Sequence, residues 1–148
     1  MRKLKIYLDN CCFNRPYDDQ TQDMIMLETT AKLMIQKLIS EKHLDLVWSY
    51  ILKYENSRNI YEAKKNAIAS WRKLSIEYVD QNSEIEILAE EIKQSGIKEA
   101  DALHVACSIF AKCDFFITVD KRILKFRSDK ITICNPLQFM SIYEGGDE

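Results

Sequence analysis

The chain has 148 residues, of which 47% are hydrophobic and 30% are charged, and its formal net charge is −2 at pH 7. A chain of this length is expected to form a single domain over residues 1–148 with a substantial core. Its apolar runs are too short to span a membrane, and its basic amino terminus lacks the apolar core of a signal peptide. We therefore expect a cytoplasmic protein without membrane contact, and its near-neutral charge does not by itself indicate a nucleic-acid binder.

Five cysteines are present, which is an odd number, and no C-x-x-C pair occurs: Cys11, Cys12, Cys107, Cys113 and Cys134. This usage predicts reduced, mainly structural thiols, and the paired spacing of a zinc site is absent. Charge is uneven along the chain, with seven acidic and two basic residues in 80–101 and five basic and one acidic residue in 121–130. The basic segment could contact a polyanion, although a solvated charged face is the simpler interpretation.

The first half of the chain alternates between strand and helix patterns. A strand is predicted at residues 4–8, followed by Asp9 and Asn10, and residues 11–19 are predicted to form a loop. A long helix over about 21–41 follows, with one apolar stripe. Residues 44–48 form the second predicted strand. Ser49 or a neighbour would cap a short helix that carries Glu55.

The second half continues the alternation. A helix is predicted over about 60–73 and a strand over 74–79. Ser83 and Glu86 have the spacing of a capping box, so the next helix is expected to begin with Ser83 as its cap and to stop at Gly96. A helix carrying Asp101 then precedes a strand at 114–118, and a short strand is predicted at 131–133. The expected fold is α/β, with a central parallel sheet and helices on both faces.

Three carboxylates stand out against their apolar surroundings. Asp9 and Asp120 each follow a predicted buried strand, and Asp101 lies in the first turn of a helix that is apolar around most of its circumference. Buried charges are costly unless they are paired or bind a metal. Parallel sheets bind ligands at the carboxyl ends of their strands, where strand order reverses. If their strands are neighbours, Asp9 and Asp120 face each other at that edge.

Four motifs in order resemble the PIN domain family: residues 6–10 ending in Asp9 and Asn10, Glu55 after the second strand, residues 101–106, and residues 117–120. The resemblance extends from about residue 4 to about residue 139. It implies a three-layer α/β/α sandwich and a metal-dependent endoribonuclease that hydrolyses RNA. Many members of the family are toxins of bacterial toxin–antitoxin pairs, so an antitoxin protein is an expected partner, and a homodimer is possible.

The resemblance implies that Asp9, Glu55, Asp101 and Asp120 are catalytic, and that Asp9, Asp101 and Asp120 bind Mg²⁺ or Mn²⁺. Such hard cations prefer oxygen ligands. Asn10 and Thr118 are expected to hydrogen-bond the carboxylates of the acidic site. Three basic residues are expected to contact RNA phosphates: Arg15, Lys121 and Arg122. Two-metal logic also suggests in-line attack that leaves a 3′-hydroxyl and a 5′-phosphate.

Each assignment has a simpler alternative. Asp9 and Asp120 could cap the segments that follow them, and Asp101 could favour its helix start through the helix dipole. Glu55 competes with Glu62 or with an ordinary exposed acid. His104, one turn after Asp101, is interpreted as a core histidine in preference to a catalytic one.

Two other functions compete with the ribonuclease. A phosphohydrolase with an aspartyl-phosphate would need a second Asp two residues after the nucleophile, but Asn10 and Cys11 follow Asp9. A non-catalytic protein of the same fold that binds RNA or a partner would have no need of four acids.

Overall fold

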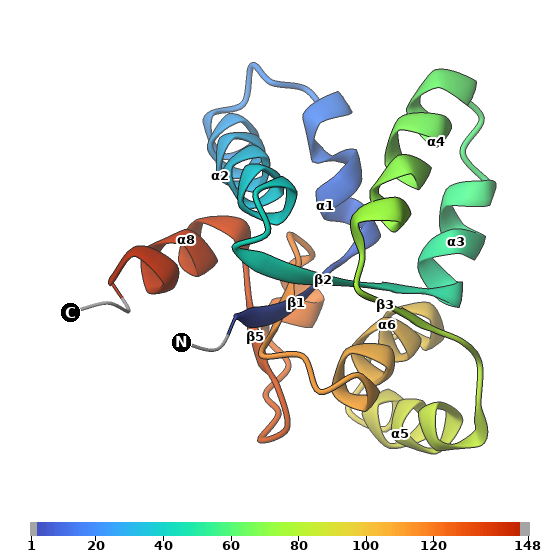
Figure 1. Cartoon of the computed structure of the whole chain (residues 1–148). Coiled ribbons are helices and arrows are strands. Elements are labelled where there is room, and N and C mark those ends of the chain that lie inside the picture. Colours follow the sequence, from blue (N-terminus) through green and yellow to red (C-terminus); the bar gives the residue numbers. More distant parts are fainter. Residues whose placement is uncertain (1–2, 146–148) are drawn as a thin grey trace.

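Five strands form a parallel sheet at the centre of the computed structural model, which describes residues 3–145 (Figure 1). Their order across the sheet is β3-β2-β1-β4-β5, and every neighbouring pair is parallel. The strands are β1 (Leu4–Leu8), β2 (Leu44–Ser49), β3 (Glu77–Val79), β4 (Phe115–Ile117) and β5 (Thr132–Cys134).

Helices connect consecutive strands. In chain order they are α1 (Asn10–Asn14), the 3₁₀ turn η1 (Arg15–Tyr17), α2 (Asp23–Ser40), α3 (Tyr50–Ser57), α4 (Glu62–Ala69), η2 (Ser70–Leu74), α5 (Ser83–Lys93), α6 (Glu99–Phe110), α7 (Lys121–Leu124) and α8 (Pro136–Gly145). None of the helices in the described part of the chain is long and apolar enough to cross a bilayer.

The helices make two layers around the sheet. Figure 1 shows α1, α2 and α4 on one side of the strands and α5 and α6 on the other, with α8 beside α2. Right-handed crossovers explain this division. The chain moves outward from β1 to β2 and β3 with its connections on one face, then returns across the sheet to β4 with α5 and α6 on the opposite face. The expected three-layer α/β/α architecture is confirmed.

The central strands are buried on both faces. In β1, Ile6, Tyr7 and Leu8 are fully buried, and Leu46 and Val47 of β2 are buried as well. Such continuous apolar runs are typical of parallel strands covered by helices on each side. At about 25 cal/mol per Å² of apolar area removed from water, this layered core is the main term that stabilises the fold.

The strand order reverses between β1 and β4. The chain leaves β1 toward β2 on one side, whereas β4 and β5 extend the sheet on the other side. Leu8 of β1 pairs in register with Ile117 of β4, so the residues that follow these strands lie together at the carboxyl edge. This is the position at which open α/β sheets bind ligands.

Several local expectations were wrong. Residues 11–19 are mostly α1 and η1 and not a loop, and residues 60–73 divide into α4 and η2. The strand predicted at 74–79 spans only Glu77–Val79. The amino-terminal cap of α5 is Asn82 and not Ser83, because Asn82 Oδ1 accepts a hydrogen bond from Ile85 N at 3.0 Å. Gly96 has a φ of +93° just after α5, which fits the expected glycine stop.

Candidate active site

Asp9 is a buried carboxylate at the end of β1, with 4% of its surface exposed. Its Oδ1 accepts a hydrogen bond from Asn10 N at 2.8 Å and thereby caps α1. Its Oδ2 accepts hydrogen bonds from Thr118 Oγ1 at 2.8 Å and from Cys11 Sγ at 3.3 Å. These three donors satisfy the oxygens of a buried carboxylate and fix the direction in which it points.

Thr118 joins the ends of β1 and β4. Its hydroxyl donates to Asp9 and accepts a hydrogen bond from Asp120 N at 3.0 Å. Asp120 in turn caps α7, because its Oδ1 accepts from Arg122 N at 2.8 Å. Since β1 and β4 are neighbours, Asp9 and Asp120 lie at the same edge of the sheet, as the alternation of strands and helices predicts.

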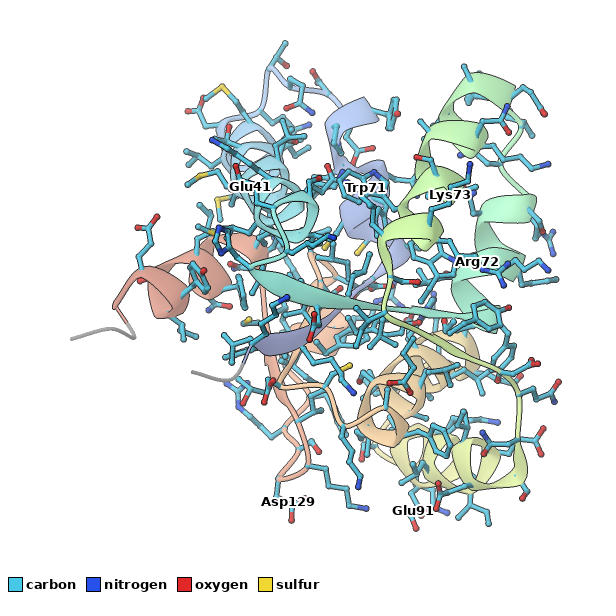
Figure 2. The ribbon with its side chains drawn as sticks, viewed as in Figure 1. Glu41, Trp71, Arg72, Lys73, Glu91 and Asp129 are labelled. Atoms are coloured by element: carbon cyan, nitrogen blue, oxygen red, sulfur yellow. The ribbon has the colours of Figure 1, made fainter. Side chains whose placement is uncertain are left out.

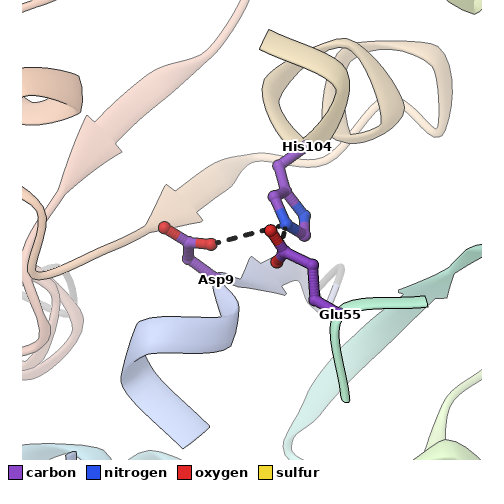
Figure 3. A group of neighbouring side chains, drawn as sticks. All are labelled: Asp9, Glu55 and His104. Atoms are coloured by element: carbon purple, nitrogen blue, oxygen red, sulfur yellow. Dashed lines mark hydrogen bonds and ion pairs between the residues drawn. The ribbon is translucent and has the colours of Figure 1, made fainter. Parts of the chain in front are cut away.

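Glu55 and His104 reach the same place from two helices. Figure 3 shows Glu55 of α3 and His104 of α6 converging on Asp9. The distance from His104 Nε2 to Glu55 Oε1 is 2.6 Å, and that from Nε2 to Asp9 Oδ1 is 3.8 Å. The His104 side chain is completely buried, whereas 27% of the Glu55 side chain is exposed. The Glu55 carboxylate is therefore partly exposed to solvent, while its Oε1 is hydrogen-bonded to the buried His104.

A buried chain of hydrogen bonds supports His104. Tyr7 OH lies 2.6 Å from His104 Nδ1 and 2.6 Å from Ser49 Oγ, and Ser49 Oγ accepts from Leu52 N at the start of α3. Burial raises the pKa of Tyr7 well above its usual value, so the phenol stays neutral. With neutral His104, each hydroxyl donates to the next member, and His104 Nε2 donates to Glu55. The chain thus connects β1, β2 and α6 to the Glu55 carboxylate.

The pKa values of Asp101 and His104 report the charges around them. Burial raises the pKa of Asp101, and the charges of Asp9, Asp120 and Glu55 raise it further against the opposing effect of His104. Burial lowers the pKa of His104, but the hydrogen bond with Glu55 and the nearby carboxylates reverse this, and the net shift is upward. Asp101 in the first turn of α6 thus belongs electrostatically to the same acidic group.

The arrangement contains donors suited to a divalent cation. Ligand atoms of Asp9, Glu55 and His104 all lie within 4.8 Å of one another. Asp101 and Asp120 stand outside this compact group. The Asp101 charge raises the pKa of His104, and the Asp120 charge raises the pKa of Asp101. Four carboxylates provide the oxygen-rich donor set that Mg²⁺ and Mn²⁺ prefer. A cation would also offset the repulsion that raises the pKa of Asp101.

The remaining predicted residues lie around this group. The Arg15 guanidinium forms salt bridges with two carboxylates, Glu28 at 2.9 Å and Asp18 at 3.0 Å. Its charge is therefore already paired within the protein. Lys121 and Arg122 are exposed at the start of α7, directly after Asp120. Asn10 begins α1, and its Oδ1 is buried with no hydrogen-bond partner in the described residues.

The sequence does not predict four of the contacts around the acids. Tyr7 belongs to the first predicted strand and Ser49 is predicted only as a helix cap, whereas their contact joins positions 42 apart in the chain. Cys11 was assigned a structural role, yet its Sγ contacts both Asp9 and Thr118. Asn56 lies within a polar run that carried no distinguishing pattern. Cys11 at two positions after a strand-end carboxylate is the one signal that could have been read.

The fold is similar to that of chains in two solved structures. The VapBC2 complex from Rickettsia felis, bound to a DNA fragment from its promoter, contains a chain with 15% identity and a TM-score of 0.56, covering 89% of this chain and 98% of that one. The DNA-bound VapBC complex from Salmonella typhimurium gives 14% identity and a TM-score of 0.57, with 90% and 98% covered. No curated protein gives a significant match. The profile of the PIN domain matches residues 6–128, and the chain therefore belongs to the PIN domain family.

Proposed function

We propose that the protein is a metal-dependent endoribonuclease that hydrolyses RNA phosphodiester bonds. The observation that carries this proposal is the convergence of Asp9, Glu55, Asp101 and Asp120 at the switch point of the sheet. Membership of the PIN domain family supports the same reaction class.

Each carboxylate has a role that follows from its surroundings. Asp9, Asp101 and Asp120 would hold Mg²⁺ or Mn²⁺, which when bound supplies an activated water and stabilises charge on the scissile phosphate. Thr118 orients Asp9 and Asp120, because it hydrogen-bonds both. Glu55 Oε1 is engaged by His104, which leaves Oε2 free to accept a proton from a bound water.

We further propose a protein partner. The similar structures are VapBC complexes, in which a protein of this fold is bound to a second protein, and this supports a toxin with a cognate antitoxin in the cytoplasm. Large apolar side chains on α2 are exposed and offer a surface for an antitoxin or a second copy of the chain: Met24, Met26, Leu27, Leu33 and Met34. Exposed apolar groups gathered on one helix are typical of interaction surfaces.

Cleavage of labelled RNA tests the activity. Wild-type protein is expected to cut in Mg²⁺ or Mn²⁺ and to stop in EDTA, and Asp101→Asn is expected to lower kcat/KM by at least about 100-fold, because a charged group that holds the cation is lost. Asp129→Asn is the matched control. Asp129 lies just before β5, at the opposite edge of the sheet from the acids, and lines a surface with Glu91 (Figure 2).

Two results would contradict the proposal. Equal cleavage in EDTA would exclude a metal-dependent reaction. RNA binding without cleavage, unaffected by Mn²⁺ and by Asp101→Asn, would instead support a non-catalytic RNA-binding protein.

A further inference from the structure

A polar pocket of about 280 Å³ lies directly beside the acidic site, between α1, α3 and the start of α4. Glu55 belongs to both the pocket and the acidic site, and Asn10 is the neighbour of Asp9 in sequence. The volume is close to the lower end of the roughly 300–1,000 Å³ of small-molecule sites. An RNA chain bound at Glu55 could therefore insert one small chemical group into this pocket.

The pocket is rich in amide side chains, because Asn10, Asn14, Asn56 and Asn59 all line it. Each amide has one donor and one acceptor end. Asn14 Nδ2 donates to Asn10 O at 2.9 Å, and Asn59 Oδ1 accepts from Tyr61 N at 3.1 Å, so the opposite ends of these two side chains are left for a ligand. Amides of this kind can match the donors and acceptors on the edge of a base.

Two of the amides have an unmet hydrogen-bonding need. Asn10 Oδ1 and Asn56 Oδ1 are buried and have no partner in the described residues. Asn56 is only 5% exposed, and its Nδ2 is fixed by Lys65 O at 2.9 Å. Because a buried acceptor without a donor is unfavourable, a side-chain rotation that brings Asn10 Oδ1 to a ligand donor would be favoured.

Two cations in the pocket wall each rest on an exposed tyrosine ring. The Arg58 guanidinium lies 5.8 Å from the ring centre of Tyr54, and Lys64 Nζ lies 5.0 Å from that of Tyr17. More than half of the surface of each tyrosine is exposed. Cations for phosphates combined with aromatic faces for bases are the usual means of binding single-stranded nucleic acid.

We propose that this pocket binds one nucleobase of a single-stranded RNA next to the scissile phosphate. The proposal rests on the ribonuclease function proposed above. The amides contact the base edge, Arg58 and Lys64 contact the backbone phosphates, and the Tyr17 and Tyr54 rings stack neighbouring bases. A peptide segment of a protein partner fits less well, since Ile60 is the only apolar residue among the described residues that line the pocket.

Substrates with a single missing base provide the test. An RNA with one cleavage site is made in versions that each lack the base at one position near the cut, and kcat/KM is measured for each. One position is expected to stand out with a loss of about tenfold, because the base that the pocket binds contributes to the affinity for the strand. The double variant Asn14→Ala, Asn59→Ala is expected to remove the additional loss at that one position, whereas Asn66→Ala on the exposed surface of α4 keeps the wild-type pattern.

Lys64→Ala provides a second measurement that does not depend on the amides. Losing one phosphate contact is expected to lower the slope of log affinity against log salt by about 0.7 for a single strand. Lys53→Ala removes an exposed charge from α3 outside the pocket and is expected to leave the slope unchanged.

The outcomes separate this proposal from the ribonuclease. If the protein cuts RNA but no position stands out, or if the double variant keeps the wild-type pattern, the pocket does not bind a base. Loss of binding to a protein partner with unchanged RNA cleavage would assign the pocket to that partner and overturn the proposal. The same set of RNAs, bound in EDTA and followed by fluorescence anisotropy, tests the pocket even if no cleavage occurs.

Discussion

Glu55 is held by a side chain that comes from the core. His104 is fully buried, and its two ring nitrogens contact Glu55 on one side and Tyr7 on the other. A buried histidine that is completely hydrogen-bonded is a structural residue by the usual criteria. Here the same contacts also fix the position of a carboxylate at the site, so a core role and a positioning role do not exclude each other.

Removing the Tyr7 hydroxyl tests this link. Tyr7→Phe leaves His104 Nδ1 and Ser49 Oγ without their shared partner, so we expect the free energy of unfolding to fall by about 1–3 kcal/mol. Glu55 loses part of its support, so kcat is expected to fall while KM changes little. Urea denaturation and RNA cleavage measure the two effects. Tyr143→Phe in α8 is the control, and equal effects of both substitutions would contradict a specific role of Tyr7.

The raised pKa of Asp101 predicts how stability depends on pH without metal. A carboxyl group whose folded pKa lies above its unfolded value loses stability as pH rises through the unfolded value of about 3.9, and the loss is complete above the folded value. Asp101→Asn removes this loss. In EDTA the variant is therefore expected to melt at a higher temperature than wild type near neutral pH. Near pH 3, about one unit below the unfolded pKa, Asp101 is protonated in both states, so the two melting temperatures should be equal.

His104 contributes to stability in its protonated form. Its pKa is raised in the folded protein, so this contribution to the free energy of unfolding is fully present below the unfolded pKa of about 6.5 and is lost as pH rises through the folded pKa. Both groups therefore make metal-free wild type less stable toward neutral and higher pH. A Tm for Asp101→Asn at or below that of wild type at neutral pH would contradict a raised pKa of Asp101, which burial and the neighbouring carboxylates together produce.

At the scale of elements, two acids of the site are also helix caps. Asp9 caps α1 and Asp120 caps α7 through side-chain oxygens. The two interpretations of these residues, as cap and as ligand, are therefore compatible. Each carboxylate uses one oxygen for backbone donors, and this fixes the direction in which the other oxygen points.

Asp120 allows the two roles to be measured separately. Asn and Asp are comparable amino-terminal caps, whereas Ala is poor. Asp120→Asn keeps the cap and relieves the repulsion with Asp101, so it is expected to be at least as stable as wild type in EDTA, but it should lose cleavage because the charge is gone. Asp120→Ala is expected to lose cleavage and also about 0.5–2 kcal/mol of stability. If Asp120→Asn cleaves RNA at the wild-type rate, Asp120 serves only as the cap of α7.

The elements that sequence predicted well are those with a strong local pattern. β1 and β2 each contain three consecutive apolar residues, Ile6–Leu8 and Leu46–Trp48. Ser49 does cap α3, since its Oγ accepts a hydrogen bond from Leu52 N. The α1 helix was missed because its five residues include polar and turn-forming types, while Cys12 and Phe13 are buried by long-range packing. The cap of α5 was misplaced by one residue because Asn82 and Ser83 are both good caps.

At the scale of the whole molecule, topology explains which parts of the site were predictable. Asp9 and Asp120 could be placed together because parallel strands end at one edge. The contact between Glu55 and His104 joins α3 to α6 across 49 positions, and nothing local in the sequence encodes it. The pocket beside Glu55 is formed by three helices, so it too depends on how the elements pack. The sequence thus predicted that Asp9 and Asp120 lie at one edge of the sheet, and packing determined the contacts of Glu55.

Metal binding connects the site to the stability of the whole fold. A ligand that binds only the native state adds RT ln(1 + [L]/Kd), or about 2.7 kcal/mol at 100 times its dissociation constant. We expect Mn²⁺ to raise the Tm of wild type relative to EDTA, because it binds the assembled carboxylates and offsets their repulsion. Asp101→Asn is expected to gain less, since one charge is missing, although it starts from a higher Tm in EDTA. Asp129→Asn should gain as much as wild type. If Mn²⁺ raises all three melting temperatures equally, it binds outside the acidic site, and if it raises none, the four carboxylates do not form a metal site.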